Sequence, residues 1–419
     1  MFVKLAVKSL IDRKGSITLS LLAMTVSIFV LLSVEHIRFQ IKESFSSTLS
    51  GVDLVVGAKT GNLNLLLYSV FRIGKPTNNI SWKSFKNFSD NPKVNWAIPL
   101  ALGDSHKGYP VLGTNIDFFK HYSYGQNNKL VFDKGGVFDG LFDVVLGSEV
   151  ARRLGLQLSE KLVISHGLSE ISFIKHDEMP FTIVGILKPT GTPVDNTLHV
   201  SLHAIEAIHS GYDFKQKDLK NHTLNKTLEV KMFAPQNITA FMVSLQSKIT
   251  TFQFQREINN YSKEPLLAIL PGVVLSELWQ IMGFVENSLL LISALVFLSA
   301  CSGVSAILLS SIRERIKDIH LLRVMGAPPI FIFFLLELEA LIITFISVIF
   351  AIIMLFIFSH ISQSYLVAKL GLNIEKAGFS ELSLLTLVII ISTSLIVSLI
   401  PALYAYFKGT RKEKVFFID

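Results

Sequence analysis

Hydrophobic and polar positions divide the chain into two kinds of segment. Four runs carry no charged residue: Ser16–Val34, Asn287–Ser311, Ala340–Ser359 and Leu382–Phe407. Each run has about the 20 apolar residues that a membrane-crossing helix needs. One such run would also suit a buried helix of a large soluble protein, but four runs predict a membrane protein. We expect transmembrane helices at residues 16–38, 281–311, 329–359 and 381–407.

The long middle of the chain, residues 39–280, alternates short strands with helices and has the composition of a soluble domain. Residues 143–167 predict strand, helix and strand, with Gly155 ending the helix. Residues 181–202 predict strand, turn-rich loop and strand. Residues 228–234 predict a strand, and residues 238–252 a helix. The fold class is therefore membrane α-helical, with four transmembrane helices and a large mixed α/β domain.

Two further segments are amphipathic. Phe2, Leu5 and Leu10 recur at helical spacing, which predicts a short interfacial helix on the inner membrane surface over residues 1–15; a frayed basic start is the alternative. Residues 310–329 predict a second helix, with Gly326 ending it and two prolines suited to the first turn of the next helix.

Basic residues indicate the orientation, because short cytoplasmic segments carry the positive excess. Residues 1–15, 312–328 and 408–419 together hold twelve basic and five acidic residues. The difference of seven charges equals the net charge of +7 for the whole chain. We therefore place both termini and the 312–328 loop in the cytoplasm of a bacterial inner membrane. Residues 39–280 and a short loop at 360–380 are then extracytoplasmic. The net positive charge therefore reflects the membrane topology and contact with anionic lipid, and it does not indicate nucleic-acid binding.

Cysteine usage limits how the outer domain is stabilised. Cys301 is the one cysteine and lies in the second predicted span. The extracytoplasmic domain can therefore hold no internal disulfide, and its stability must come from its core.

Several stretches resemble the MacB, LolE and FtsX superfamily of ABC permeases, also called type VII. "RERIKDIHLLRVMGAPPIFIFFLLELEALII" (residues 313–343) is similar to the family's cytoplasmic loop and third helix, and "LIPALYAYFKGTRKEKV" (residues 399–415) to its closing helix. "VVLGSEVARRLGL" and "FTIVGIL" resemble outer-domain strands with their intervening helix. The order of one span, a large outer domain and three spans is also similar.

The resemblance implies a MacB-like periplasmic core of two lobes. Residues 40–100 and 225–270 would form a membrane-near lobe, and residues 101–224 an inserted lobe. It also implies two permease copies, as a homodimer or close heterodimer, paired with ABC ATPase subunits. Such permeases transmit ATP-driven motion to the outer domain.

No Gly-x-x-x-x-Gly-Lys-Ser/Thr sequence occurs, so we expect no nucleotide site of the P-loop kind and no enzymatic activity from this chain. ATP and magnesium would belong to the partner ATPase, and we expect no cofactor or metal on the permease. The contact for that ATPase is expected on the cytoplasmic helix; a plain solvated loop is the alternative. The coupling residues are Arg313, Arg315, Ile316, Ile319, Leu322 and Arg323.

Glu337 and Glu339 stand in an otherwise apolar stretch, where ionisable side chains are costly. Counting about 20 residues back from Ser359 places both at the cytoplasmic interface, within reach of Arg13 or Arg315. Glu339 also matches a glutamate of the family. We expect a structural or coupling ion pair here rather than a proton or ion relay.

Two features of the outer domain leave alternatives open. Histidines 166, 176, 199, 203 and 209 could suggest a metal site, but their spacing is not that of a helical pair, and surface histidines are the preferred interpretation. An apolar patch after the first span is either lobe core or a surface for substrate or lipid. Its members are Leu63, Leu65, Leu66, Leu67, Tyr68 and Phe71.

The sequence therefore favours a permease subunit that drives export or extraction of a hydrophobic or lipid-linked substrate. The alternative is an FtsX-like transducer that activates a periplasmic partner protein without transport. The expected partners are an ABC ATPase, a second permease copy, membrane lipid, and a periplasmic adaptor or substrate protein.

Overall fold

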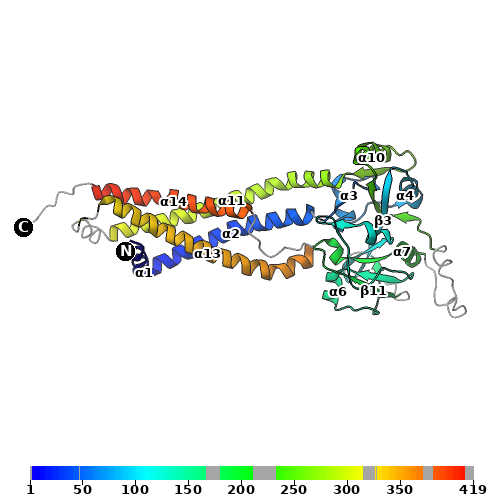
Figure 1. Ribbon diagram of the computed structural model, residues 1–419, viewed down its shortest axis with the longest axis horizontal. Helices are drawn as coiled ribbons and strands as arrows, with labels where there is room; N and C mark the ends of the chain where they lie inside the picture. Colours follow the sequence, from blue (N-terminus) through cyan, green and yellow to red (C-terminus); the bar gives the residue numbers. More distant parts are fainter. Residues whose placement is uncertain are drawn as a thin grey trace, which may run out of the picture. The chain divides into compact units, whose positions relative to one another are not determined.

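The computed structural model describes residues 2–46, 48–166, 180–210, 233–314, 326, 328–370 and 381–410. The chain divides into two compact units (Figure 1). The helical unit comprises Met1–Gln40, Gly283–Ser362 and Glu375–Asp419, and the α/β unit comprises Ile41–Met282 with Gln363–Ile374. The division falls inside three long helices, so each of these helices contributes residues to both units.

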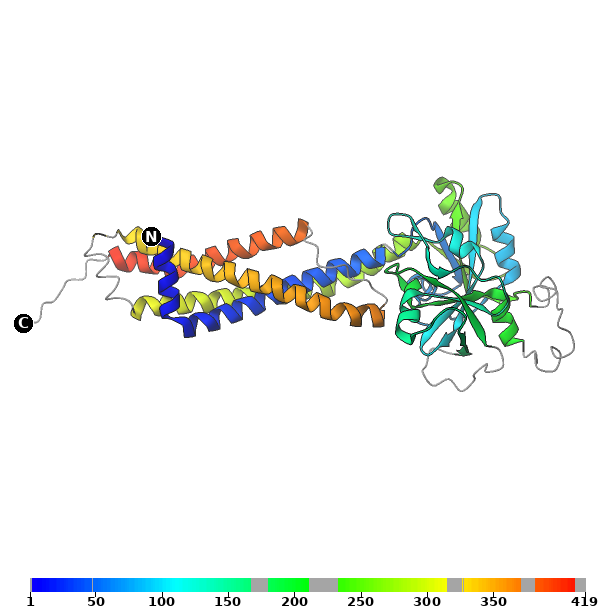
Figure 2. The ribbon, with the colours of Figure 1, turned by 60° about the horizontal axis from the view of Figure 1, so that its bottom comes forward.

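Four long helices and one short helix supply the helical unit. They are α1 (Phe2–Asp12), α2 (Lys14–Ser46), α11 (Pro271–Glu314), α13 (Pro329–Leu370) and α14 (Glu381–Thr410). The four long helices are each long and apolar enough to cross a membrane, as the sequence predicts. Figure 2 shows α1 lying across the long helices, at a steep angle to α2. The predicted N-terminal helix is thus present, and its place on the membrane surface stays a prediction.

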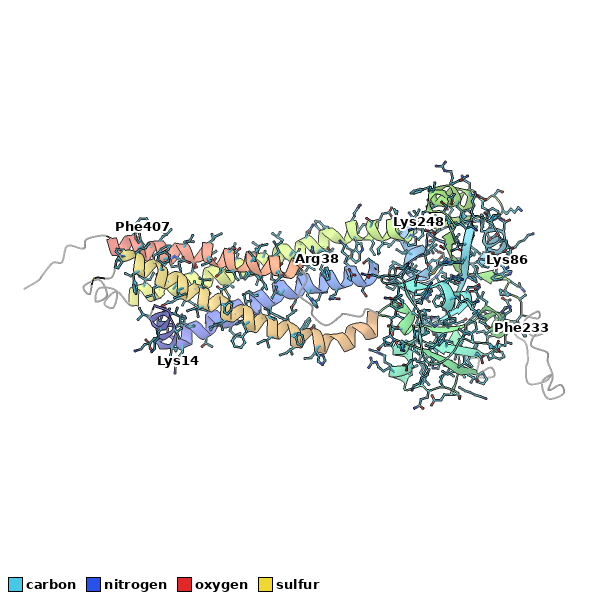
Figure 3. The ribbon with its side chains drawn as sticks, viewed as in Figure 1. Lys14, Arg38, Lys86, Phe233, Lys248 and Phe407 are labelled. Atoms are coloured by element: carbon cyan, nitrogen blue, oxygen red, sulfur yellow. The ribbon has the colours of Figure 1, made fainter. Side chains whose placement is uncertain are left out.

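The long helices bury one set of apolar side chains among themselves and present another set outward. Met24, Ile28, Cys301 and Leu308 are buried in their core. Apolar side chains also cover the outer faces, among them Leu22, Phe345, Ile396 and Phe407, and Figure 3 shows side chains projecting outward all along these helices. A helix that is apolar all round suits a lipid environment, because lipid replaces water as the outer contact.

The α/β unit is built on one sheet of eleven strands. The main path runs β15-β1-β14-β3-β4-β12-β8-β11-β7, with β10 paired to β3 and β9 to β11. These strands are β1 (Leu54–Ala58), β3 (Val94–His106), β4 (Tyr109–Thr114), β7 (Phe132–Gly135), β8 (Asp143–Leu146), β9 (Lys161–Leu162), β10 (Ser165–His166), β11 (Phe181–Leu187), β12 (Leu198–Ser201), β14 (Ala240–Leu245) and β15 (Leu266–Ile269). Two small ribbons pair β2 (Ile80–Ser81) with β13 (Asn237–Ile238), and β5 (Ser123–Tyr124) with β6 (Asn128–Lys129).

The helices of this unit cover the sheet. They are α3 (Asn62–Ser69), α4 (Trp82–Ser89), α5 (Asp117–His121), α6 (Ser148–Leu154), α7 (Leu202–His209) and α10 (Thr251–Asn259), with 3-10 turns at Pro193–Asn196 and Lys248–Thr250. In β1, Val55 belongs to the core cluster with α3, whereas Leu54 and Val56 belong to the cluster with α4 and α10. The strand is therefore buried on both faces, which explains its unbroken apolar sequence.

The thirteen-residue strand β3 lies between two parts of the sheet, the strands β15, β1 and β14 on one side and the strands from β4 to β7 on the other. Its first half pairs with β14, and its second half, from Ala101 to His106, pairs with β4. The register of the second pairing shifts between Leu102 and Ser105, and Gly103 has a φ of +151°. This backbone favours glycine, so the strand bends there. The two lobes and their proposed boundaries stay predictions.

Most outer-domain elements agree with the sequence interpretation. Residues 143–166 form β8, α6, β9 and β10, and Gly155 ends α6 in the left-handed conformation. Residues 181–201 form β11, a 3-10 turn and β12, again as predicted. The helix predicted over residues 238–252 is wrong: β14 occupies Ala240–Leu245, and a helix begins only at Thr251. All six residues of β14 are buried, so the segment lacks the alternation that identifies a half-exposed strand.

Candidate functional site

Glu337 and Glu339 both lie on α13, and both are buried, with exposed fractions of 8% and 0%. Residues two apart on a helix do not share a face. The two carboxylates therefore contact different neighbours within the helical unit, and each has its own geometry.

Glu339 pairs with Arg13, which stands between α1 and α2. The Arg13 Nη2 donates to Glu339 Oε2 at 2.8 Å, and the Ser9 hydroxyl donates to Glu339 Oε1. Arg13 also donates to the Ser9 hydroxyl at 3.2 Å. Arg13 is one of the two cations expected from the sequence, and Arg315 lies outside the described residues. The cluster joins α1, the start of α2 and α13 by charge-assisted hydrogen bonds.

Glu337 faces α14 instead. Its Oε2 accepts a hydrogen bond from the Ser398 hydroxyl at 2.7 Å, and its Oε1 has no partner among the described residues. Glu337 is therefore not part of an ion pair in the described part of the chain. Sequence reasoning treated the two glutamates alike and missed Ser398, because a serine in an apolar span gives no signal by itself.

Other polar side chains also join neighbouring helices. Thr344 and Ser394 lie 2.5 Å apart between α13 and α14, and the Ser305 hydroxyl on α11 donates to the Val397 carbonyl at 3.2 Å. The Thr386 hydroxyl donates to Glu35 at 2.5 Å. Such contacts satisfy polar groups where water is scarce and fix how the helices pack.

The expected coupling segment is described only at its borders. Arg313 lies in the last turn of α11, which ends at Glu314, and α13 begins at Pro329. Arg315, Ile316, Ile319, Leu322 and Arg323 lie outside the described residues. Their role in coupling stays a prediction.

Four members of the apolar patch after the first span are core residues. Leu65, Leu66, Tyr68 and Phe71 are at most 7% exposed and belong to one hydrophobic cluster. Leu63 and Leu67 are half-buried and pack against the same cluster. Most of this patch therefore belongs to the core of the α/β unit, and a role in contacting substrate or lipid stays a prediction.

The histidines are not all surface residues, which corrects the preferred interpretation. His199 is completely buried beside Phe118 and Phe119, and burial lowers its pKa to about 3. Burial also lowers the pKa of His203. A hydrogen bond to Asp104, 3.4 Å away, raises the pKa of His209.

The histidine sites differ in kind. His166 lies in β10, and His176 is outside the described residues. In the part of the chain that the structure describes, no group of three His, Cys, Asp or Glu side chains could hold a metal ion.

The α/β unit also contains a cavity of about 690 Å³, in the size range of small-molecule sites. It lies among α4, α5 and the start of α7, with Trp82, Phe138 and Leu202 among its walls. Lys86, Lys120 and His203 also line it. Sequence reasoning missed this cavity, because it is formed by segments far apart in the chain.

Comparison with known proteins supports a family assignment for the C-terminal helices. Residues 290–410 match the family model described as FtsX-like permease C-terminal. No curated protein sequence matches the chain significantly.

Two solved structures show a distant similarity. The periplasmic region of MacB from Actinobacillus actinomycetemcomitans is 9% identical, with 55% of this chain and 94% of that one covered and a TM-score of 0.35. The extracellular domain of the noncanonic ABC-type transporter YknZ from Gram-positive bacteria is 11% identical, with 52% and 98% covered and a TM-score of 0.30. The last three long helices, where they fall within residues 290–410, are therefore similar to the C-terminal part of FtsX-like permeases.

Proposed function

We propose that this chain is the permease subunit that transmits the motion of a separate ATPase to its extracytoplasmic α/β unit. The motion serves export or extraction of a hydrophobic or lipid-linked substrate. The observation that carries the proposal is the buried contact of Arg13 with Glu339.

That contact lies close to the expected coupling segment in the chain. α13 begins at Pro329, directly after this segment, and Glu339 follows within three turns. Removing one partner of a buried ion pair costs about 3–5 kcal/mol of stability. Separating α13 from Arg13, at the junction of α1 and α2, is therefore unfavourable. A displacement of the segment before Pro329 would therefore move α2 together with α13.

α2 offers a continuous path for that displacement. It runs without a break from Lys14 to Ser46, and its last residues belong to the α/β unit. A helix transmits axial and rotational movement because every backbone group is hydrogen-bonded within it. The chain has no P-loop sequence of its own, which supports an energy source on another subunit.

The coupling segment provides the test. Ile316→Asp would bring a carboxylate into a protein groove without a partner, and that costs several kcal/mol, or a loss of affinity by orders of magnitude at about 1.4 kcal/mol per factor of ten. We expect the mutant permease to lose its ATPase subunit on copurification and to lose stimulated ATP hydrolysis. The purified permease alone should hydrolyse no ATP.

Ile316→Leu is the matched control and should retain the ATPase, because it keeps an apolar side chain of the same size. Expression and protease resistance of the α/β unit should be unchanged in both variants. Full retention of subunit and activity by Ile316→Asp would show that this segment is not the coupling element. ATP-dependent activation of an outer partner without movement of any lipid would favour the transducer instead.

A further inference from the structure

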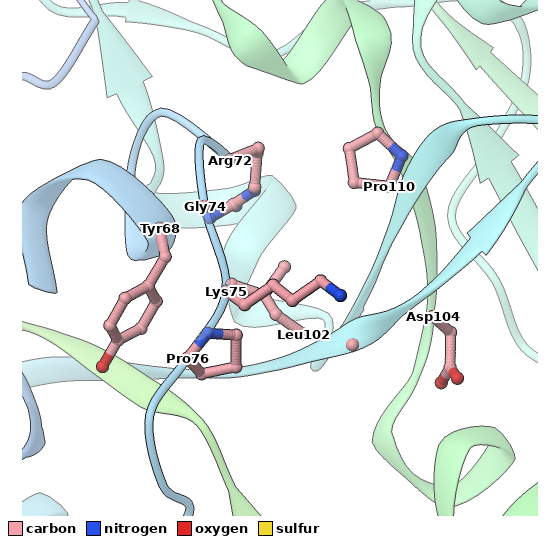
Figure 4. A pocket seen from close by; sticks show the side chains of 9 residues that line it. Tyr68, Arg72, Gly74, Lys75, Pro76, Leu102, Asp104 and Pro110 are labelled. Atoms are coloured by element: carbon pink, nitrogen blue, oxygen red, sulfur yellow. The ribbon is translucent and has the colours of Figure 1, made fainter. Parts of the chain in front are cut away.

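A second cavity, of about 210 Å³, lies in the α/β unit between the loop after α3 and the bend of β3 (Figure 4). Its apolar wall consists of the Tyr68 ring, Pro76, Leu102 and Pro110. An apolar cavity of about 150 Å³ is known to bind benzene, so this one can take a short hydrocarbon segment.

Two cations share this cavity with the apolar wall. Arg72 has a backbone φ of +60°, a left-handed conformation that is uncommon for residues other than glycine. This backbone conformation sets the direction in which the Arg72 side chain leaves the loop. Arg72 as a whole residue is half-buried, and its guanidinium donates a hydrogen bond to the Ser69 carbonyl. Figure 4 shows the Lys75 side chain extending across the cavity toward β3.

Neither cation forms a salt bridge with a described carboxylate. Burial lowers the pKa of Arg72 to about 10, which reflects the cost of keeping this cation away from water. A guanidinium with no counter-ion among the described residues can bind an anion, since its planar fork matches carboxylate and phosphate groups.

Asp104 also lines the cavity, but its charge is engaged elsewhere. His209 lies 3.4 Å from the Asp104 carboxylate, and this neighbour raises the pKa of His209. Asp104 thus has a neighbour of its own in His209, and the cavity lining holds two cations against this one carboxylate.

We propose that this cavity binds an amphiphilic anion, with a carboxylate or phosphate head at Arg72 and Lys75 and a hydrocarbon segment against Tyr68, Leu102 and Pro110. The fatty-acyl carboxylate and the lipid phosphate share this chemistry. The inference rests on the proposed function only in treating the ligand as cargo, because binding itself needs no ATPase.

The test measures binding of radiolabelled octanoate to the full chain in nanodiscs by equilibrium dialysis, with empty nanodiscs as the blank. Unlabelled octyl phosphate, octanol and inorganic phosphate serve as competitors. Arg72→Met should weaken octanoate binding about tenfold or more, because it removes a charge-assisted hydrogen bond. Lys75→Gln should weaken binding by a smaller factor, and Lys248→Gln, an exposed cation outside the cavity, should leave binding unchanged.

The competitors identify the source of the anion. Stronger competition by octyl phosphate supports a lipid phosphate, and weaker competition supports an acyl carboxylate. Octanol that competes as well as octanoate, or inorganic phosphate that competes as well as octyl phosphate, would overturn the proposal. Should Arg72→Met fail to fold, undiminished binding by Lys75→Gln, whose side chain is exposed, would overturn it too. None of these outcomes bears on ATPase coupling, which the Ile316 variants test separately.

Discussion

Gly147 stands at the start of α6, where two backbone segments come very close. A Cβ atom at this position would lie 2.2 Å from the Val194 carbonyl oxygen and 2.4 Å from that of Asp195. Asp195 is itself held in place, because its carboxylate accepts hydrogen bonds from the backbone of Thr190 and Gly191. The close approach explains why a glycine precedes the helix in the "VVLGSEV" segment.

Gly147→Ala should therefore destabilise the α/β unit by an amount at the upper end of the about 1–3 kcal/mol that overpacking costs. Denaturant unfolding followed by tryptophan fluorescence would measure it, since Trp82, Trp96 and Trp279 all lie in this unit. The control is Gly61→Ala, where no atom lies within 4 Å of the new Cβ and the change should be small. Equal stability of the two variants would contradict the close approach.

His199 should make the stability of the α/β unit depend on pH. Its folded pKa of about 3 is below the roughly 6.5 of an unfolded histidine, so protons bind the unfolded chain more readily between these values. The contribution of His199 to the free energy of unfolding is thus complete above about pH 6.5 and falls as the pH falls, by at most about 1.4 kcal/mol per pH unit.

The variant His199→Phe isolates this contribution, because phenylalanine suits the aromatic contacts with Phe118 and Phe119. Unfolding of wild type and variant should be compared from pH 7 to pH 4. We expect the variant to lose less stability than the wild type in this range. Parallel pH profiles for the two proteins would show that His199 is protonated as easily in the fold as in the unfolded chain.

At the scale of elements, the buried pair of Arg13 and Glu339 should hold α1 and α13 together. Glu339→Ala leaves the Arg13 charge buried without a partner and should destabilise the helical unit by about 3–5 kcal/mol. Thermal inactivation of ATPase coupling in nanodiscs would measure the loss. The double variant Arg13→Met with Glu339→Met should recover much of the stability, since no charge is then left unpaired.

Arg38 and Glu286 provide the comparison for that experiment. Their atoms are 4.0 Å apart, and the side chains are 31% and 22% exposed. Arg38→Gln should therefore cost no more than about 1 kcal/mol, as for pairs near solvent. A similar loss from Arg38→Gln and Glu339→Ala would mean that burial does not set the strength of the Glu339 pair.

The elements that were predicted correctly are those with local signals. The helix α6 is bounded by Gly147 and Gly155, and the four spans are long and uncharged. β14 was predicted as a helix because its alternation is lost when both faces are buried, and only its pairing with β1 and β3 makes it a strand. That pairing joins residues more than a hundred positions apart, which no short window of sequence reports.

The same limit applied to the candidate sites. Arg13 could be proposed as a partner of Glu339, because both are charged residues at the edge of apolar runs. Ser398 beside Glu337 gave no such signal. The cavity with Arg72 and Lys75 depends on the bend of β3 near Gly103, so its residues could not be brought together before the fold was known.

At the scale of the whole molecule, the charge distribution predicts the topology, and every functional proposal depends on it. The basic residues beside the spans fall in residues 1–15, 312–328 and 408–419, which should be cytoplasmic because positive segments are retained on that side. Reporters fused after Lys317 and Lys412 should therefore give a cytoplasmic signal. Those fused after His106, in β3, and His360, near the end of the third span, should give an external signal.

Paired reporters active on opposite sides of the membrane, such as alkaline phosphatase and green fluorescent protein, control for expression at each fusion site. The His106 fusion is decisive, because it reports the side on which the α/β unit folds. With the predicted topology, the α/β unit would meet a lipid or a protein outside the cytoplasm, and the segment before Pro329 would face the ATPase. A cytoplasmic signal at His106 would instead put the α/β unit on the side of ATP hydrolysis, and transmission across the membrane would then have no receiving domain.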